Sequence, residues 1–315
     1  VPLTFSVKGA GEQVYAKFPH LKGLSALQIS EADLANVPMM LRGQVAIAIF
    51  DDKQNLVDVT ALQIPGVLDD LYPYTGELGV AFSDGTPTLR LWAPTANAVK
   101  LHLYPDASSA SSEQVALTFD AATGVWSVTG EPDWKNQYYL YEVEVYVPST
   151  GTVETNLVTD PYSISLSMNS LRSQIVDMAD PDLQPIDWLS LEKPPLEAFE
   201  DSVIYELHLR DFSVSDPSVP EELRGTYLAF AETESNGMQH LKKLAEAGVT
   251  HVHLLPVFDI ASINEDKTTW VTVDPVELAG YAPNSDQQQL ALALGGDERE
   301  EVLAHLVELL ANRIT

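Results

Sequence analysis

Cysteine is absent from this chain of 315 residues. Its absence excludes a disulfide scaffold, a cysteine nucleophile and a zinc site built on cysteine ligands. Long apolar runs are absent as well, and without one of about 18 residues no membrane-spanning helix is predicted. The chain begins at Val1 without a basic, apolar leader, so we expect a signal peptide to have been removed or never to have been included.

Positive charge is scarce in this sequence. It holds 17 lysines and arginines against 46 aspartates and glutamates, which gives a net charge of −29 at pH 7. So negative a surface repels phosphate backbones and anionic lipids, and we expect neither nucleic-acid nor membrane-surface partners. A neutral partner such as a polysaccharide is compatible with this charge, and so is a purely solubilising role. The length suggests about two domains.

Predicted strands dominate the first 177 residues. Residues 1–75 hold few of them, with one buried strand at 45–50, and look like part of something larger. Residues 76–177 alternate apolar and polar side chains over short segments that turn residues separate. About six short strands in a hundred residues predict an immunoglobulin-like β-sandwich. These strands are expected at 88–93, 98–104, 115–120, 125–129, 138–147 and 152–158.

Residues 178–315 differ from the first 177 in proline content and in their predicted secondary structure. Residues 178–200 contain four prolines and are interpreted as a linker or docking strap, because proline resists both helix and strand pairing. From residue 201 the pattern becomes strand, helix, strand, expected at 203–212, 238–247 and 249–257. Such a βαβ unit predicts a parallel sheet, whose two faces both need cover.

Several stretches along the chain form a recognisable set. They include VIYELHLRDFS at 203–213, GVTHVHLLPVFDIASINED at 248–266, TPTLRLWAPT at 86–95 and ELRGTYL at 222–228. Together with Asp160-Pro161-Tyr162 they resemble type I pullulanases and limit dextrinases. Those are debranching enzymes of the α-amylase superfamily, glycoside hydrolase family 13. The resemblance covers nearly the whole chain, in order, but only the N-terminal part of such an enzyme.

The resemblance implies a multidomain fold, β first and α/β afterwards. Residues 1–75 would be the tail of an N-terminal β domain. Residues 76–177 would be a β-sandwich of the carbohydrate-binding module 48 type, and 178–200 a Pro-rich linker. Residues 201–315 would be the first βαβ part of a (β/α)8 catalytic barrel.

The implied activity is hydrolysis of α-1,6-glucosidic linkages in starch or pullulan with retention. Retaining hydrolysis needs two carboxyl groups about 5–5.5 Å apart. The family carries an Asp nucleophile, a Glu acid/base and a stabilising Asp after later barrel strands, and this sequence has no positions matching them. No catalytic residue is therefore assigned, and the chain alone is expected to be inactive. The alternative is a non-catalytic fragment that binds or docks α-glucan.

The resemblance also implies partners and a location. The expected partner is an α-glucan, whether pullulan, amylopectin or limit dextrin, and the remainder of the same enzyme is a second candidate partner, as another chain. The expected location is secreted or on a bacterial cell surface. No cofactor is required. Calcium suits so acidic a protein, but acidic pairs such as Asp69–Asp70 lack the spacing of an EF-hand, so no metal site is assigned.

Three residues are candidates for carbohydrate contact. Trp134 falls in a predicted turn and is expected to be exposed, and sugar faces stack on exposed aromatic rings. Phe258 and Asp259 follow the second strand of the βαβ unit, at the rim that carries active sites in barrels. The alternatives are a core tryptophan and an ordinary loop cap. Glycogen-binding relatives of the sandwich carry a tryptophan where this sequence has Tyr104, which argues against direct starch binding by this module.

Two further groups of polar residues lie on predicted strands. Glu206, His208 and Arg210 share one face of the first strand, and we expect them to be buried in the barrel as a structural network or as a polar floor. His251 and His253 share a face of the second strand. A third ligand of matching type is not close in sequence, so we interpret them as core residues rather than zinc ligands.

Overall fold

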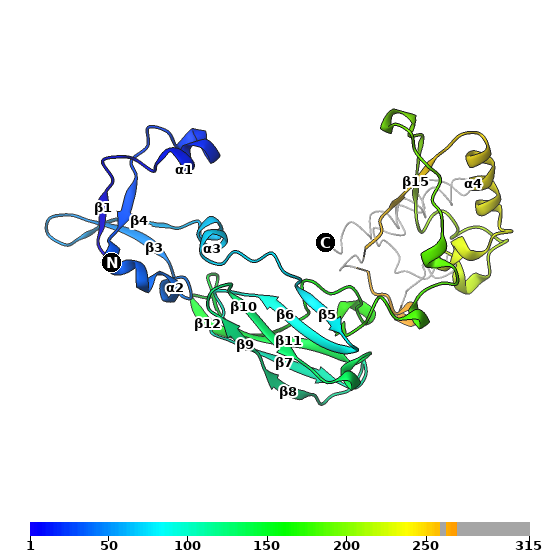
Figure 1. Cartoon of the computed structure of the whole chain (residues 1–315), viewed down its shortest axis with the longest axis horizontal. Coiled ribbons are helices and arrows are strands. Elements are labelled where there is room, and N and C mark those ends of the chain that lie inside the picture. The colour runs from blue at the N-terminus through cyan, green and yellow to red at the C-terminus, as the bar shows by residue number, and fades with distance from the viewer. Residues whose placement is uncertain (259–262, 270–315) are drawn as a thin grey trace, which may run out of the picture. The chain divides into compact units, whose positions relative to one another are not determined.

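The computed structural model describes residues 1–258 and 263–269. The chain divides into two compact units, Val1–Asp180 and Pro181–Thr315 (Figure 1). Each unit is described by itself. Within the described ranges, no helix is both long and apolar enough to cross a membrane.

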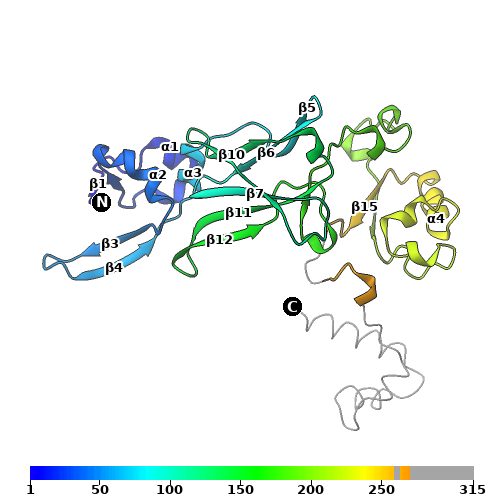
Figure 2. The same ribbon diagram turned by 90° about the horizontal axis from the view of Figure 1, so that it is seen from below.

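The N-terminal part of the first unit consists of small elements. Strand β1 pairs antiparallel with β2, and β3 pairs antiparallel with β4. The β3–β4 hairpin projects away from the strands of the sandwich (Figure 2) and exposes apolar side chains, Val57 to 64%. A lone hairpin is marginally stable, so its packing at the base matters for its order. The elements are β1 (Leu3–Phe5), α1 (Glu12–Lys17), β2 (Leu27–Ile29), α2 (Val37–Met40), β3 (Ala46–Phe50), β4 (Leu56–Ala61) and α3 (Pro65–Leu71).

The rest of the first unit is a β-sandwich of two antiparallel sheets. One sheet has the strand order β5-β6-β10-β9, and the other has the order β12-β11-β7-β8 with β13 beside β11. The predicted strand 115–120 is in fact two strands, because the chain passes from one sheet to the other at Leu117. The strands are β5 (Gly79–Ser83), β6 (Thr86–Trp92), β7 (Ala98–Tyr104), β8 (Glu113–Ala116), β9 (Thr118–Asp120), β10 (Val125–Thr129), β11 (Tyr138–Val147), β12 (Thr152–Val158) and β13 (Ser173–Gln174).

The core of the sandwich follows from alternation along its strands. Buried and partly exposed residues alternate along β6, which places Leu89 and Leu91 inside. Strands β7 and β11 supply the opposite wall with Leu101, Tyr139 and Tyr141, all fully buried. Each large side chain of this kind contributes about 1.5–3 kcal/mol on burial, so this layer is the main source of the unit's stability.

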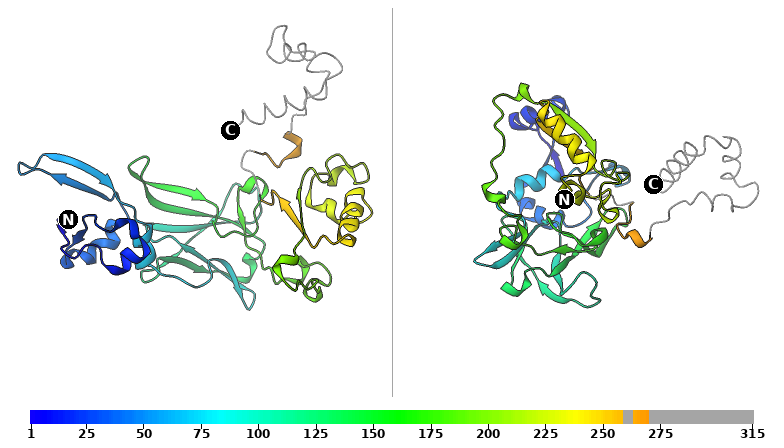
Figure 3. Two further views of the ribbon diagram at one scale, coloured as in Figure 1. Left: turned by 90° about the horizontal axis from the view of Figure 1, so that it is seen from above. Right: turned by 90° about the vertical axis from the view of Figure 1, so that its right-hand side faces the viewer.

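The second unit contains a parallel strand–helix–strand unit. Strand β14 (Ile204–His208) pairs in parallel with β15 (His251–Leu255), and α4 (Asn236–Glu246) connects them (Figure 3, yellow helix). Tyr205 faces the helix, with its ring centroid 6.0 Å from that of His240. The observed unit agrees with the predicted βαβ pattern, and the barrel beyond it stays a proposal.

The polar face of β14 corrects one expectation. Glu206, His208 and Arg210 are exposed instead of buried, because the described residues place no further element over that face. The Glu206 carboxylate lies 3.0 Å from Nδ1 of His253, and both side chains are more than half exposed. His251 and His253 are likewise exposed, so their interpretation as core residues is wrong for the described part of the chain.

Candidate functional site

A cavity of about 670 Å³ lies where the β3–β4 hairpin joins the sandwich. We call it the junction cavity, and all of it belongs to the unit Val1–Asp180. Its lining includes segments 41–46 and 59–62, Ile64, Thr95 and the β11 residues Val145 and Tyr146. The volume is within the roughly 300–1,000 Å³ of small-molecule sites.

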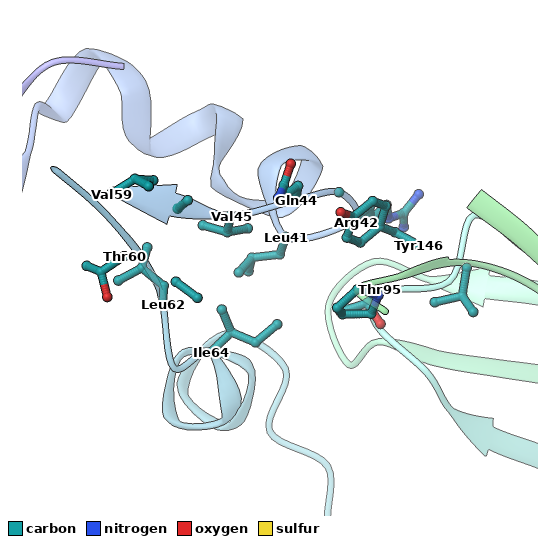
Figure 4. Close-up of a pocket in the computed structure, with 15 residues that line it drawn as sticks. Leu41, Arg42, Gln44, Val45, Val59, Thr60, Leu62, Ile64, Thr95 and Tyr146 are labelled. Atoms are coloured by element: carbon teal, nitrogen blue, oxygen red, sulfur yellow. The ribbon is translucent and has the colours of Figure 1, made fainter. Parts of the chain in front are cut away.

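The two sides of the junction cavity differ in chemistry. The hairpin side presents apolar side chains, among them Val45, Leu62 and Ile64, and the sandwich side carries Thr95 and Tyr146 (Figure 4). Leu41 between them is buried and fixes the base of the hairpin. Apolar walls with a few convergent polar groups are typical of ligand-binding sites.

Arg42 is the cation of the junction cavity. Its guanidinium carbon lies 4.8 Å from the centroid of the Phe119 ring, a cation–π contact that fixes the group against the sandwich. Its Nε is buried and has no hydrogen-bond partner among the described residues. The unsatisfied donor of the guanidinium is therefore Nε, which the surrounding protein encloses.

The described lining of the junction cavity holds polar side chains but none of the acidic or nucleophilic groups of a hydrolase. Its described lining contains no aspartate, glutamate, histidine, lysine or cysteine. Glycoside hydrolysis needs a pair of carboxyl groups, and acyl transfer needs an activated nucleophile. The cavity supplies neither, but it offers donors at Arg42, Gln44, Thr60, Thr95 and Tyr146.

The expected exposure of Trp134 is wrong. The residue ends a short 3-10 turn, as a turn residue should, but its side chain is only 8% exposed and belongs to the sandwich core. The ring packs against the backbone of Gly130, where a Cβ atom would overlap it. The turn points the indole inward, so it cannot stack on a sugar without rearranging the core.

The two other candidates do not form a site in the described residues. Phe258 follows β15 and is 78% exposed, so its ring is available to a ligand. Asp259 lies outside the described residues. Contact of either residue with carbohydrate stays a prediction.

Tyr104 is covered by another side chain of the same unit. The guanidinium of Arg172 lies 3.7 Å from the centroid of its ring. The same guanidinium donates to the backbone oxygens of Asp106 at 2.8 Å and Ser109 at 2.6 Å. Arg172 thus holds the loop after β7 in place and covers one face of the Tyr104 ring. Weak direct starch binding at this position stays a prediction.

A buried carboxylate holds the end of β11 in the sandwich. Asp160 is 4% exposed and accepts hydrogen bonds from the Tyr139 hydroxyl at 2.7 Å and the Tyr162 amide at 2.8 Å. Burial raises its pKa, and the bond from Tyr139 opposes that rise. The Tyr141 hydroxyl is buried near this carboxylate without a hydrogen-bond partner of good geometry among the described residues.

The described residues offer no metal centre. Within them, no group of three or more His, Cys, Asp or Glu side chains is arranged to hold an ion. Asp106 is an exposed acid whose carboxylate accepts hydrogen bonds from Ser108 and Ser109, and these bonds lower its pKa to about 2. That arrangement is an Asx-type turn and needs no ion.

Sequence patterns alone did not identify the junction cavity. Arg42 and Tyr146 are far apart in the sequence, and neither belongs to a motif. The strand predicted at 45–50 is confirmed as β3, but the expectation that it is buried is wrong, because most of its residues are exposed.

Comparison with known proteins identifies two domain families in the chain. Residues 1–70 match the Pullulanase N2 domain, and residues 77–163 match the carbohydrate-binding module 48 (isoamylase N-terminal domain). The chloroplastic pullulanase 1 of Arabidopsis thaliana is 41% identical over 278 residues, which are 88% of this chain and 28% of that protein. The pullulanase of Klebsiella pneumoniae is 43% identical over 265 residues, 81% of this chain and 24% of that protein.

Solved structures of pullulanases are also similar to this chain. The crystal structure of PulA from Klebsiella oxytoca has a TM-score of 0.82 and 37% identity over 96% of this chain and 29% of that one. The Klebsiella pneumoniae pullulanase complexed with maltotriose has a TM-score of 0.78 and 40% identity over 84% of this chain and 25% of that one. The chain thus spans about a quarter of the length of the relatives it matches.

Proposed function

Because this chain resembles the N-terminal part of pullulanases, we propose that it supplies the N-terminal modules of a debranching glycoside hydrolase. The observation that carries the proposal is the succession of the two matched domain families, residues 1–70 and then 77–163. The description of one solved relative as a maltotriose complex supports an α-glucan as the ligand class. The substrate would be a branched α-glucan, cleaved at α-1,6-glucosidic linkages.

We place the hydrolytic step outside the described residues. The junction cavity lacks carboxylates in its described lining, and the β14–α4–β15 unit is compatible with the start of a (β/α)8 barrel. In such a barrel the residues that react sit at the carboxyl ends of several strands. Hydrolysis with retention, the barrel itself and the domain limits 1–75, 76–177, 178–200 and 201–315 all belong to this proposal.

Location and cofactor belong to the proposal as well. An exported or cell-surface enzyme is one form of it, and a plastid enzyme is another, because the Arabidopsis thaliana relative is a chloroplastic pullulanase. No cofactor is required for the binding role, and calcium binding stays a prediction. The net charge of −29 suits an uncharged polymer in either location.

Affinity electrophoresis tests the proposed binding role. In a native gel containing pullulan, we expect the chain to migrate more slowly than in the same gel without polysaccharide. A gel containing dextran, an α-1,6-linked glucan, is the control and should retard it less. Equal mobility in all three gels would contradict a glucan-binding role for these modules.

A reducing-sugar assay tests where the chemistry resides. We expect the chain alone to release no reducing sugar from pullulan above a heat-denatured sample, because its sequence has no positions matching the carboxyl pair that a retaining hydrolase of this family needs. Release by the chain alone would contradict that placement. It would direct the search to its own acidic residues.

A further inference from the structure

The junction cavity has no role in the proposal above, which rests on domain identity. Its lining, largely apolar with a few hydroxyl and amide groups, is compatible with a neutral ligand. Arg42 would repel a cationic ligand, and the described lining has no carboxylate to attract one. The net charge of −29 would repel an anionic ligand as it approached the chain. An uncharged molecule with both apolar and hydroxyl-bearing surfaces meets neither obstacle.

We propose that the junction cavity binds a short α-1,4-linked gluco-oligosaccharide. The inference rests on the proposed function for its ligand class and on the cavity for its location. The hairpin base and the sandwich each supply part of the wall, so both are needed to enclose a sugar in this subsite.

The geometry of the cavity matches the two kinds of surface on a glucose ring. The CH faces of the sugar would pack on the apolar side chains of the hairpin side, Val45, Leu62 and Ile64, and on the ring of Tyr146. The hydroxyl edges would accept from Arg42 and exchange hydrogen bonds with Thr60 and Thr95. Polar partners in the wall of a site give orientation, while the apolar contacts give affinity.

Arg42 is held in a form that suits hydroxyl recognition. Its contact with the Phe119 ring, itself packed on Trp126 with centroids 4.8 Å apart, anchors the guanidinium to the sandwich core. A preorganised planar donor loses little side-chain entropy on binding. The same anchoring links occupancy of the cavity to the packing between the hairpin base and the sandwich.

Calorimetric titration of the whole chain with maltotriose tests the inference. Thr60→Trp places an indole in the cavity, and we expect the dissociation constant to rise by at least about tenfold. Val57→Trp is the matched control, because Val57 is an exposed position of the same strand outside the lining, and it should change the constant by less than about twofold. Cellotriose, with β-1,4 linkages, should not bind measurably.

A second variant keeps the test decisive if Thr60→Trp does not fold. Arg42→Lys keeps the charge but removes the planar donor, and we expect maltotriose to bind about fivefold more weakly. Unchanged affinity in a folded Thr60→Trp, or in Arg42→Lys, would overturn the cavity as the site. Retardation by pullulan without any binding of maltotriose would overturn it too and leave the proposed function standing. If pullulan fails to retard the unmodified chain, the proposed glucan-binding role is itself contradicted.

Discussion

Tyr139→Phe is expected to lower the free energy of unfolding of the unit Val1–Asp180 by about 2 kcal/mol. The variant removes the hydroxyl that donates to the buried Asp160 carboxylate at 2.7 Å and leaves that charge with one fewer partner. Tyr141→Phe is the matched control, because Tyr141 is equally buried but its hydroxyl has no partner of good geometry among the described residues. The Tyr141 hydroxyl still helps to lower the pKa of Asp160, so that variant should lower the free energy of unfolding by less than Tyr139→Phe does, about 1 kcal/mol at most. Urea denaturation followed by far-UV circular dichroism measures both.

The effect of Tyr139→Phe should depend on pH in a defined direction. Burial raises the pKa of Asp160 above its ordinary value of 3.8, so between the two pKa values the native state keeps a proton that the unfolded chain has lost. The contribution of this group to stability is therefore fully present below pH 3.8 and is lost as pH rises through the raised native pKa. Because Tyr139 bonds the ionised form best, the difference between wild type and Tyr139→Phe should be larger at pH 7 than at pH 3. Equal differences at both pH values, or equal effects of the two tyrosine variants, would contradict a charged Asp160 held by Tyr139.

Trp134→Ala is expected to destabilise the same unit by about 3–5 kcal/mol, because it leaves a large cavity in the sandwich core. Trp188→Ala is the control, since Trp188 is 58% exposed in the second unit, and it should change stability by less than about 0.5 kcal/mol. Trp134→Phe separates packing from sugar contact. It should keep most of the stability and all of the retardation in a pullulan gel. Comparable stability of both alanine variants, or loss of retardation in a folded Trp134→Phe, would show that Trp134 acts at the surface.

The sequence predicts the sandwich better than it predicts the site. Alternation along β7 and β11 marks their buried faces directly, and burial of Trp126 follows from its place in a strand. The split of 115–120 escapes prediction, because the apolar pattern continues through Leu117 while the chain changes sheets there. The inward turn of Trp134 escapes it as well, because a turn residue at the end of a sandwich can close the core instead of meeting solvent.

The same limit applies to the junction cavity and to the polar face of β14. The cavity depends on where the hairpin base meets β11, a tertiary contact that no local pattern encodes. The burial expected for Glu206 depends on strands beyond β14 and β15, and within the described residues its carboxylate lies 3.0 Å from Nδ1 of His253. Motifs spread over the chain indicated its relatives, because a family can be recognised from local stretches in the right order. A binding surface depends on how those stretches pack together, which the motifs do not specify.

Amide hydrogen exchange with and without maltotriose is the measurement that tests the central claim most directly. The claim is that these modules bind an α-glucan at the junction cavity without cleaving it. We predict slower exchange on addition of maltotriose in segments 41–46 and 59–62 and near Tyr146, with no change in the core strand β6 and no new reducing sugar. Protection confined to other segments, such as the loop that Arg172 holds after β7, or no protection at saturating maltotriose, would contradict it.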